Sequence, residues 1–370
     1  MGKFSKKAGR RMRLYRKKEE CCGCGACEAI CGTHAITMHQ DKEGFFYPKI
    51  DERQCVGCGR CNAVCPFKQS QKAADFLQYY GARNINEKVR RRSSSGGIFS
   101  VLANYVLERS GSVFAAGFKS DMNVCHMEIQ EKMDLDQVRR TKYVQSDMKN
   151  VFGMIRRRLD KEKWVLFVGT PCQAEALRGY LGKNFTNLII TDLVCYGAAS
   201  PGIWQKYVDF LNQRYKGKIL EYNFRDKRNQ DNGHMASWKN CAVEKAYPLS
   251  KDPYSRMYFA NMNLRPACYR CPFCKVERNS DFTIGDFWGI EKVRPDWDDG
   301  MGNSLVILHS IKAERVWEEV QDQCEVFQCR KEEILQPRLI EPTEYPRYRK
   351  VFMKVYQYAP FSLLVRKYSR

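Results

Sequence analysis

The sequence has few histidines and no long apolar run. The chain of 370 residues contains five histidines, and His34, His39, His126 and His309 lack the spacing of metal ligands. No stretch of 18 apolar residues occurs, which excludes a membrane-spanning helix. The first 18 residues lack the apolar segment of a secretory signal, so we expect a cytoplasmic protein.

Acidic residues are missing from both ends of the chain. Residues 1–18 carry nine Lys or Arg and no acid, and residues 347–370 carry seven and no acid. These ends supply most of the formal net charge of +21, because residues 19–346 hold 47 basic and 42 acidic residues. Two basic tails on a nearly balanced body argue against a nucleic-acid-binding surface, and no recognition helix or RNA-binding motif is evident. We therefore expect no nucleic acid as a partner.

The C-terminal tail mixes its bases with Phe, Tyr, Leu and Val side chains and is interrupted by Pro360. This pattern is typical of peripheral contact with an anionic membrane, here at its inner face. A solubilising tail is an equal alternative.

Cysteine is abundant, with 18 in the chain and nine of them between Cys21 and Cys65. Cytoplasmic thiols serve metal or redox roles more often than disulfides. Eight of the nine form two copies of one pattern, in which three cysteines stand three residues apart and a fourth follows four residues later. A loop with this spacing presents three thiolates to a 4Fe-4S cube, and in two-cluster ferredoxins the fourth cysteine ligates the other cube. A four-cysteine zinc site uses two separated C-x-x-C pairs instead.

The repeat therefore predicts two 4Fe-4S clusters with exchanged fourth ligands, and Cys22 is an extra thiol. The first quartet is Cys21, Cys24, Cys27 and Cys65, and the second is Cys55, Cys58, Cys61 and Cys31. Segments 35–38 and 45–48 flank a glycine and predict a hairpin between the two copies. The unit resembles bacterial-type two-cluster ferredoxins over about 50 residues, which implies electron transfer.

Strand and helix patterns alternate through the rest of the chain and predict an α/β domain. Ser93 to Gly97 lead into an amphipathic helix that begins at Ile98. The expected strands are 113–118, 124–130, 164–168, 188–195, 220–225, 282–287 and 304–308, and the expected helices are 174–182, 201–215 and 313–323. Residues 71–92 are polar, helix-compatible and then basic, and we interpret them as a linker.

Five further cysteines occupy positions that this topology can collect. Cys172 and Cys195 end predicted strands, and loops at the carboxyl ends of strands in an open α/β sheet share one crevice. Cys268, Cys271 and Cys274 form a C-x-x-C-x-x-C run. By spacing alone, this run fits a zinc knuckle, a partial iron–sulfur site or unused thiols.

A set of short motifs runs through the chain in a specific order. They are SSSGG at 93–97, KYVQS at 142–146, GTPCQ at 169–173, CYGxxSPG at 195–202, RDKRNxxxGH at 225–234, and RPACYRCPF and SDFTIGDFWG between 265 and 289. This order resembles the coenzyme F420 hydrogenase/dehydrogenase beta-subunit family, in its bacterial members with a fused ferredoxin, over about residues 19–330. The resemblance implies FAD and a third 4Fe-4S cluster. Its ligands would be Cys172, Cys195, Cys268 and Cys271, with Cys274 able to replace one of them.

The same resemblance implies a flavin beside the helix that begins at Ile98. N–H groups and the dipole at a helix N-terminus suit a pyrophosphate, although a plain helix cap uses the same residues. The predicted cofactor-binding residues are Ser95, Gly96, Gly97, Lys142, Thr170, Arg225 and Lys227. A cation beside the flavin would raise its reduction potential. The alternative is that Lys142 and the other basic residues belong to an ordinary solvated face of the protein. His234 is a candidate for the flavin or hydride-acceptor site, and Asp286 for orienting a neighbouring group.

Together these patterns predict an α+β ferredoxin domain followed by an α/β flavin- and iron–sulfur-binding domain. The expected function is an iron–sulfur flavoprotein oxidoreductase, which passes electrons between ferredoxin-type clusters and a flavin. That flavin would exchange a hydride with a soluble carrier such as coenzyme F420 or with a partner reductase. The alternatives are a non-catalytic electron-transfer subunit and, less favoured, a nucleic-acid-binding iron–sulfur protein. The expected divisions are a basic tail at 1–18, the two-cluster domain at 19–72, the first part of the beta-subunit-like region at 73–155, its C-terminal α/β part with the third cluster and flavin at 156–340, and a basic aromatic tail at 341–370.

Overall fold

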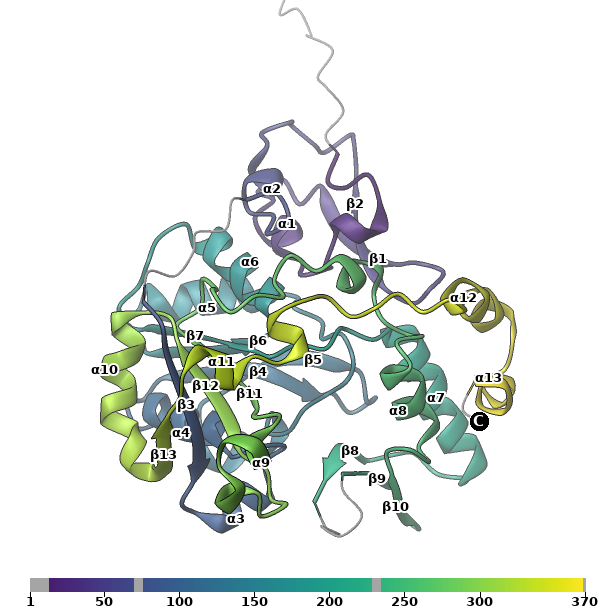
Figure 1. The fold of residues 1–370 in the computed structure, drawn as a ribbon. Coiled ribbons are helices and arrows are strands. Elements are labelled where there is room, and N and C mark those ends of the chain that lie inside the picture. The colour runs from purple at the N-terminus through teal and green to yellow at the C-terminus, as the bar shows by residue number, and fades with distance from the viewer. Residues whose placement is uncertain (1–12, 70–75, 228–233, 369–370) are drawn as a thin grey trace, which may run out of the picture.

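The computed structural model describes residues 13–69, 76–227 and 234–368 (Figure 1). Residues 1–12 of the predicted basic tail and residues 228–233 of the RDKRNxxxGH motif lie outside these ranges. An N-terminal ferredoxin-like unit is followed by an α/β domain with a mixed sheet. This arrangement agrees with the predicted order of the two folds.

Two short helices and a hairpin make up the ferredoxin-like unit. The helices α1 (Ala26–Ala29) and α2 (Arg60–Ala63) each grow out of one cysteine loop. The strands β1 (Ile36–Gln40) and β2 (Phe46–Ile50) pair antiparallel, which confirms the predicted hairpin. Gly44 takes φ +80° in the turn, a left-handed conformation that glycine adopts without strain.

An eight-stranded sheet forms the centre of the α/β domain. Four neighbouring strands, β4, β6, β7 and β11, run parallel, and the strands on either side of them pair antiparallel. In spatial order the strands are β13 (Cys324–Gln328), β3 (Gln78–Asn84), β12 (Ser304–Leu308), β11 (Phe282–Asp286), β7 (Leu188–Leu193), β6 (Val165–Gly169), β4 (Ser112–Phe118) and β5 (Val124–Ile129). The predicted segments 73–155 and 156–340 thus contribute to one sheet.

Helices cover both faces of this sheet, and side chains in the strands alternate between them. Val165 and Phe167 pack under α5 (Val151–Leu159) and α6 (Pro171–Leu181), whereas Leu166 lies in the cluster of α4 (Ile98–Leu107) and α10 (Ile311–Val320). Because successive strand residues face opposite sides, a strand buried on both faces reads as one apolar run. The central strands therefore carry a clear sequence signal.

The interpretation of residues 71–92 as a linker is wrong for its described part. Residues 78–84 form β3, which pairs with both β12 and β13, and α3 (Glu87–Arg91) follows. Tyr80 lies 5.6 Å from the ring of Trp317, and Ala82 is fully buried. Polar residues beside Tyr80 and Ala82 obscure the alternation of apolar and polar side chains that marks a strand. In addition, the strands that pair with β3 lie more than 200 residues later in the sequence.

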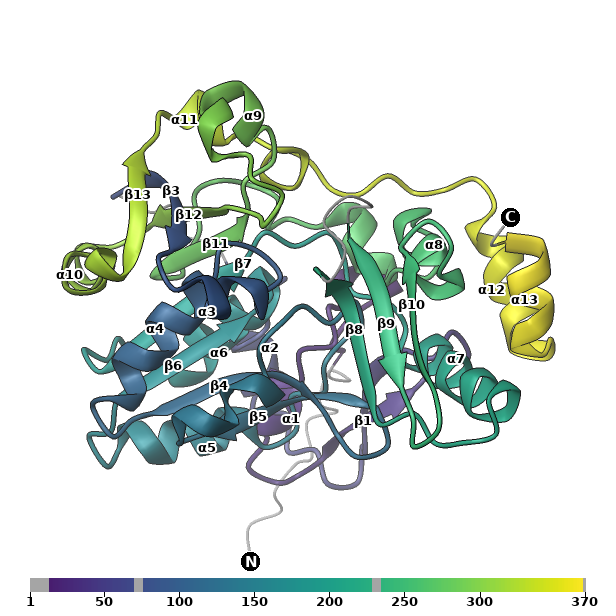
Figure 2. The same cartoon turned by 90° about the horizontal axis from the view of Figure 1, so that it is seen from below.

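A second, smaller sheet lies beside the large one (Figure 2). It comprises β8 (Glu221–Asp226), β9 (Met235–Lys239) and β10 (Glu244–Pro248), all antiparallel. An aromatic core that includes Trp204 and Phe224 joins this sheet to the neighbouring helices. The remaining helices of the described chain are α7 (Pro201–Arg214), α8 (Pro253–Phe259), α9 (Ile290–Val293), α11 (Lys331–Ile334), α12 (Arg349–Tyr358) and α13 (Phe361–Tyr368).

The C-terminal tail is part of this aromatic core. Helices α12 and α13 flank α7, and Phe352, Phe361 and Leu364 are buried there (Figures 1 and 2). The break between the two helices falls at Pro360, as predicted. Much of the apolar surface that fitted a membrane is thus engaged within the protein, and contact with a membrane receives no support. No helix in the described ranges is long and apolar enough to cross a membrane.

Candidate functional site

The first cysteine loop is buried between the ferredoxin-like unit and the α/β domain. Cys24 and Ala26 belong to the same apolar cluster as Met148 and Phe152. Helix α1 contacts α5 and α6 of the α/β domain, and these contacts hold the loop in place. This half of the repeat is therefore shielded from water by the α/β domain.

The predicted first quartet lies together in this region. Burial, and after it the thiols of Cys21 and Cys65, raise the pKa of the Cys27 thiol. A contact with Cys22 lowers the pKa of Cys24, but burial, and after it Cys27 and Cys21, raise it overall. Burial, and more weakly Cys21, raise the pKa of Cys65. The last of these cysteines comes from the other copy of the repeat, as the exchanged-ligand hypothesis requires.

The second cysteine loop faces outward. Cys58 is exposed, and the side chain of Val56 is 72% exposed. Burial, and more weakly Cys55 and Cys58, raise the pKa of the Cys61 thiol. Cys31 packs in the same small cluster as Cys61, so the fourth predicted ligand again comes from the other half.

The two loops share one backbone conformation. Gly23 and Gly57 have φ values of +69° and +70°, and Gly25 and Gly59 have +78° and +77°. Residues with a Cβ rarely adopt this left-handed region, so both loops need glycine at these positions. The sequence repeat is thus also a structural repeat.

All five cysteines of the predicted third group lie together. Cys172 begins α6 after β6, and Cys195 follows β7, the next parallel strand. Burial, and then Cys268, Cys172 and Cys274, raise the pKa of Cys195. A hydrogen bond joins the thiols of Cys271 and Cys274, and it holds the pKa of Cys274 at about 7. Cys274 is therefore as close to the group as the four cysteines that the resemblance implies.

Cys22 connects the first loop to this third group. Its thiol makes a hydrogen bond with Cys172, which raises the pKa of the Cys172 thiol, and burial raises it further. Sequence reasoning left Cys22 without a role, because its spacing fits neither quartet. The sequence shows only that Cys22 stands next to Cys21, a predicted cluster ligand.

Arg265 is a second residue that sequence reasoning missed. It precedes the 3-10 helix Pro266–Arg270 that carries Cys268, and its guanidinium reaches the backbone of Cys21. Arg265 is the first residue of the RPACYRCPF motif, in which only the cysteines were interpreted as functional.

Among the described residues, no three Cys, His, Asp or Glu side chains converge as ligands of a single metal ion.

A cavity of about 710 Å³ opens next to the third cysteine group. Cys22, Cys172 and Cys195 line one part of it. Six of the seven predicted cofactor-binding residues line it as well, namely Ser95, Gly97, Lys142, Thr170, Arg225 and Lys227. Gly96 does not, because its N–H donates to the Ser304 hydroxyl at 3.0 Å and a Cβ there would meet the Ala82 carbonyl at 2.6 Å.

Two kinds of family model match the chain. Residues 162–332 match the family model for the C-terminal part of the coenzyme F420 hydrogenase/dehydrogenase beta subunit. Over these residues the chain is similar to that family. Residues 20–69 and 47–95 match two models of 4Fe-4S dicluster domains, which support the predicted ferredoxin clusters. The chain is thus an iron–sulfur electron-transfer protein related to the F420 hydrogenase beta subunit, a family of oxidoreductases.

Among solved structures, the chain is similar to the xenon-derivatised F420-reducing NiFe hydrogenase complex from Methanosarcina barkeri. The two share 16% sequence identity over 81% of this chain and 92% of the other, with a TM-score of 0.48. At these values the likeness carries no conclusion about activity or partners. No curated protein matches the chain.

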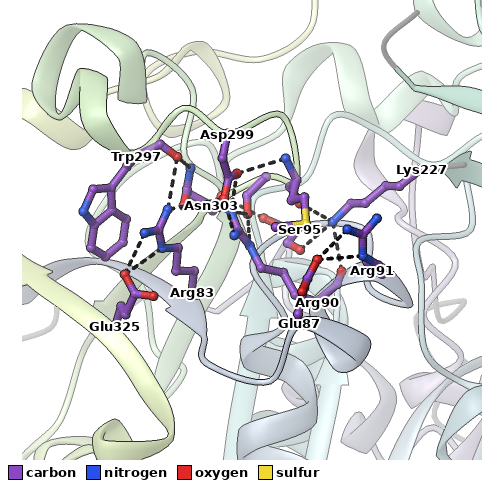
Figure 3. Close-up of polar contacts among 12 residues, drawn as sticks. Arg83, Glu87, Arg90, Arg91, Ser95, Lys227, Trp297, Asp299, Asn303 and Glu325 are labelled. Carbon is purple, nitrogen blue, oxygen red and sulfur yellow. Dashed lines mark hydrogen bonds and ion pairs between the residues drawn. The ribbon is translucent and has the colours of Figure 1, made fainter. Parts of the chain in front are cut away.

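In the beta-subunit domain, Lys227 fastens the loop of Ser95 (Figure 3). Its ammonium donates to the carbonyl oxygens of Ser95 at 2.8 Å, Met301 at 2.5 Å and Arg90 at 3.2 Å. Burial, and more weakly the charge of Arg225, lower the pKa of Lys227 to about 7. Lys227 therefore shapes the cavity wall through three backbone contacts.

Arg90 holds the same loop from its other side. Its guanidinium forms an ion pair with Asp299 and donates to the Gly302 carbonyl, as Figure 3 shows in part. Ser95 adds a hydrogen bond from its hydroxyl to the Asn303 carbonyl at 2.8 Å. The SSSGG segment is thus fixed to the residues between β11 and β12 rather than free to open.

Arg225 is the centre of a polar group that also lines the cavity. It forms an ion pair with Asp286 and donates to Nε2 of His234. Burial, and then the charge of Arg225, lower the pKa of His234 to about 4, so this imidazole is neutral at pH 7. A fixed cation and a neutral imidazole therefore face the same space.

Lys142 and an aromatic group complete the cavity. The ammonium of Lys142 donates to the Arg139 and Arg140 carbonyls, and burial lowers its pKa to about 7. Tyr143 stacks on Tyr258 with ring centroids 4.4 Å apart. Polar groups at several points around an aromatic wall are the usual composition of a cofactor pocket.

Proposed function

We propose that this chain couples one-electron transfer through 4Fe-4S clusters to hydride exchange at a flavin held in the cavity. A single observation carries the proposal: thiols of the third cysteine group and six predicted flavin-binding residues line the same cavity. A flavin supplies the conversion between one-electron and two-electron chemistry, which a cluster alone does not provide. The cavity volume falls within the ordinary range of small-molecule sites.

Cys172, Cys195, Cys268 and Cys271 would hold the third cluster. Soft thiolates suit iron–sulfur clusters, and all four side chains lie close together in a water-poor region. Ala198 donates its N–H to the Cys268 sulfur at 3.3 Å, a contact typical of cluster ligands. Cys274 is a fifth thiol in contact with Cys271 and is able to replace one of the four.

The residues around the cavity fit a flavin with phosphates. Ser95 and Gly97 lie at the start of the ten-residue helix α4, whose dipole favours negative charge. Lys142 is held almost out of water, so an anion beside it would raise its pKa and restore its charge. Arg225 would stabilise negative charge on a reduced flavin, and Asp286 holds its guanidinium in place.

The hydride partner would be a soluble carrier, such as coenzyme F420, or a partner reductase. The family description names F420 for the relatives of residues 162–332. His234 is neutral and lies beside Arg225, where it would contact either the flavin or the incoming carrier. Electrons would enter or leave through the exposed second cysteine loop.

Metal analysis tests the clusters. Anaerobically prepared protein should contain about twelve iron atoms per chain, from three cubes. Cys172→Ser should lower this number to about eight, whereas Cys241→Ser should leave it unchanged because Cys241 is exposed and outside all three groups. Eight iron atoms in the wild-type protein would remove the third cluster from the proposal.

A flavin and carrier assay tests the catalytic part. Protein purified under anaerobic conditions should carry FAD or bind added FAD, and refusal of FAD would overturn the flavin assignment. The reduced protein is then offered F420, NAD⁺ and NADP⁺, and turnover of one of them identifies a carrier. Bound flavin without turnover of any free carrier would assign the chain instead to a non-catalytic electron-transfer subunit.

A further inference from the structure

Arg265 is a deeply buried cation without a carboxylate partner. The exposed fraction of this residue is 1%. Three other arginines in the described ranges are buried to a similar degree, and each has an acid: Arg90 pairs with Asp299, Arg278 with Asp192, and Arg349 with Glu43. No Asp or Glu within the described residues pairs with Arg265. Because a buried unpaired charge is costly, its counter-charge must be sought among other groups.

The groups around Arg265 belong to the first cysteine loop. Its guanidinium donates to the carbonyl oxygens of Cys21 at 2.7 Å and Phe46 at 3.0 Å, and to Oε1 of Gln145 at 2.9 Å. It also contacts the Cys21 sulfur at 3.7 Å. Tyr47 lies across its face, with the ring centroid 4.1 Å away. These contacts hold the cation in one position beside a predicted cluster ligand.

Gln145 tightens the same arrangement from the α/β domain. Its amide donates to the carbonyl oxygens of Cys22 and Gly23, each at 3.2 Å. A Cβ on Gly23 would meet Nη1 of Arg265 at 2.7 Å, so the guanidinium packs directly on the loop backbone. Arg265 is also near the third group, because the N–H of Cys268 donates to the Arg265 carbonyl at 2.9 Å.

We propose that the first cluster is the missing counter-charge, and that Arg265 raises the reduction potential of this cluster and leaves that of the second unchanged. This inference rests on the two ferredoxin clusters of the proposed function. Arg265 acts as a positioning and electrostatic residue, not as a ligand. Net charge, hydrogen bonds to sulfur and solvent exposure set the potential of a cluster, and Arg265 changes the first two at the first quartet and not at the second.

Among the described residues, no buried cation packs on the second quartet. The nearest bases in its loop, Arg53 and Arg60, are exposed, so water screens their charge. One added electron makes a cluster more negative by one charge, and a fixed cation in a dry site stabilises that charge strongly. Burial of the first loop by itself makes added negative charge costlier there, and the cation of Arg265 offsets that cost.

A redox titration of the full-length, cluster-loaded protein, followed by EPR, tests this inference. Arg265→Met should lower the potential of one cluster so that its one-electron equilibrium constant falls at least tenfold, or about 59 mV. Arg265→Lys keeps the charge and should give a smaller shift. Arg60→Gln is the matched control on the second loop and should shift neither potential. Cys58→Ser alters the signal of the second cluster and Cys172→Ser that of the third, so the remaining signal is that of the first.

Unchanged potentials in Arg265→Met, or equal shifts of both clusters, would overturn the inference. If Arg265→Met does not retain its iron, Arg265→Lys decides: a shift confined to the first cluster supports the inference, and no shift overturns it. The comparison uses only the signals assigned to the two ferredoxin clusters. Loss of the flavin or the third cluster from the proposed function would therefore leave it intact, and the two failures are distinguishable.

Discussion

The two cysteine loops have the same spacing and the same backbone, yet they lie in opposite environments. Gly23 and Gly57 share one conformation, but the first loop is packed under Arg265 and Gln145 while nothing lies within 4 Å of a Cβ placed on Gly57. Equivalent positions differ accordingly, with buried Ala26 in the first copy and exposed Arg60 in the second. Ligand geometry is therefore a property of the repeat, whereas insulation and charge come from the domain on which one copy rests.

The strongest test of this difference exchanges residues at equivalent positions. Ala26→Arg would force a charged side chain into the contact between α1 and the α/β domain, and we expect it to lower the free energy of unfolding by about 4 kcal/mol or more. Arg60→Ala should change it by less than about 0.5 kcal/mol, because Arg60 is exposed. Chemical denaturation measures both. Equal effects would show that the two loops are equally buried in solution.

Removal of one ligand from each loop separates cluster loss from loss of packing. Cys24→Ala and Cys58→Ala should each remove about four iron atoms, because each takes a ligand from one cube. Only Cys24→Ala should also weaken the protein after the iron is removed, by about 1–2 kcal/mol, since Cys24 packs in an apolar cluster. Iron analysis and denaturation of the iron-free variants check this. A comparable loss of stability in iron-free Cys58→Ala would contradict it.

Alanine at the two equivalent glycines gives a smaller but informative contrast. Both substitutions place a Cβ in the left-handed region, which costs roughly 1–2 kcal/mol. Gly23→Ala has an added cost of about 1–3 kcal/mol, because the new atom would lie 2.5 Å from the Gln145 amide and 2.7 Å from Arg265. Gly57→Ala meets no neighbour. The difference between the two free energies of unfolding is the measured quantity, and a difference near zero would argue against the close packing of Arg265.

The smallest expected effect concerns the residue after the first cysteine of each loop. Cys22→Ser should cost about 1 kcal/mol, because the Cys22 thiol contacts Cys172, and it should alter the absorption of the proposed third cluster. Val56→Ser, its exposed equivalent, should change stability by less than about 0.5 kcal/mol and leave the spectrum unaltered. Identical visible spectra for both variants would mean that Cys22 does not connect the first loop with the third group.

Local pattern and strand order were enough to predict much of this site. Cys172 and Cys195 follow two apolar strands, and parallel neighbours end at the same edge of a sheet, so their meeting could be expected. Strand β3 could not, because its polar context hides the alternation and its pairing strands come from the far end of the chain. The asymmetry of the loops was also missed. The sign of this asymmetry in the sequence is that Ala26 in the first loop stands where the second loop has Arg60. Arg265 reaches the first loop from 244 residues away, so no local pattern could indicate it.

The contact between helix α12 and the hairpin of the ferredoxin-like unit also implies an order in which contacts form during synthesis. Arg349 donates to the carboxylate of Glu43 at 2.8 Å, across 306 residues of sequence, beside the point where the N–H of Gly202 reaches the Gly44 carbonyl. A ribosome adds about 5–20 residues per second, so this fastening arises roughly 15–60 s after the hairpin has been made. The contacts that cover the first cysteine loop come from α5, α6 and Arg265, which are made earlier in synthesis. Arg349 therefore ties down the hairpin turn of a unit whose first loop already has its partners.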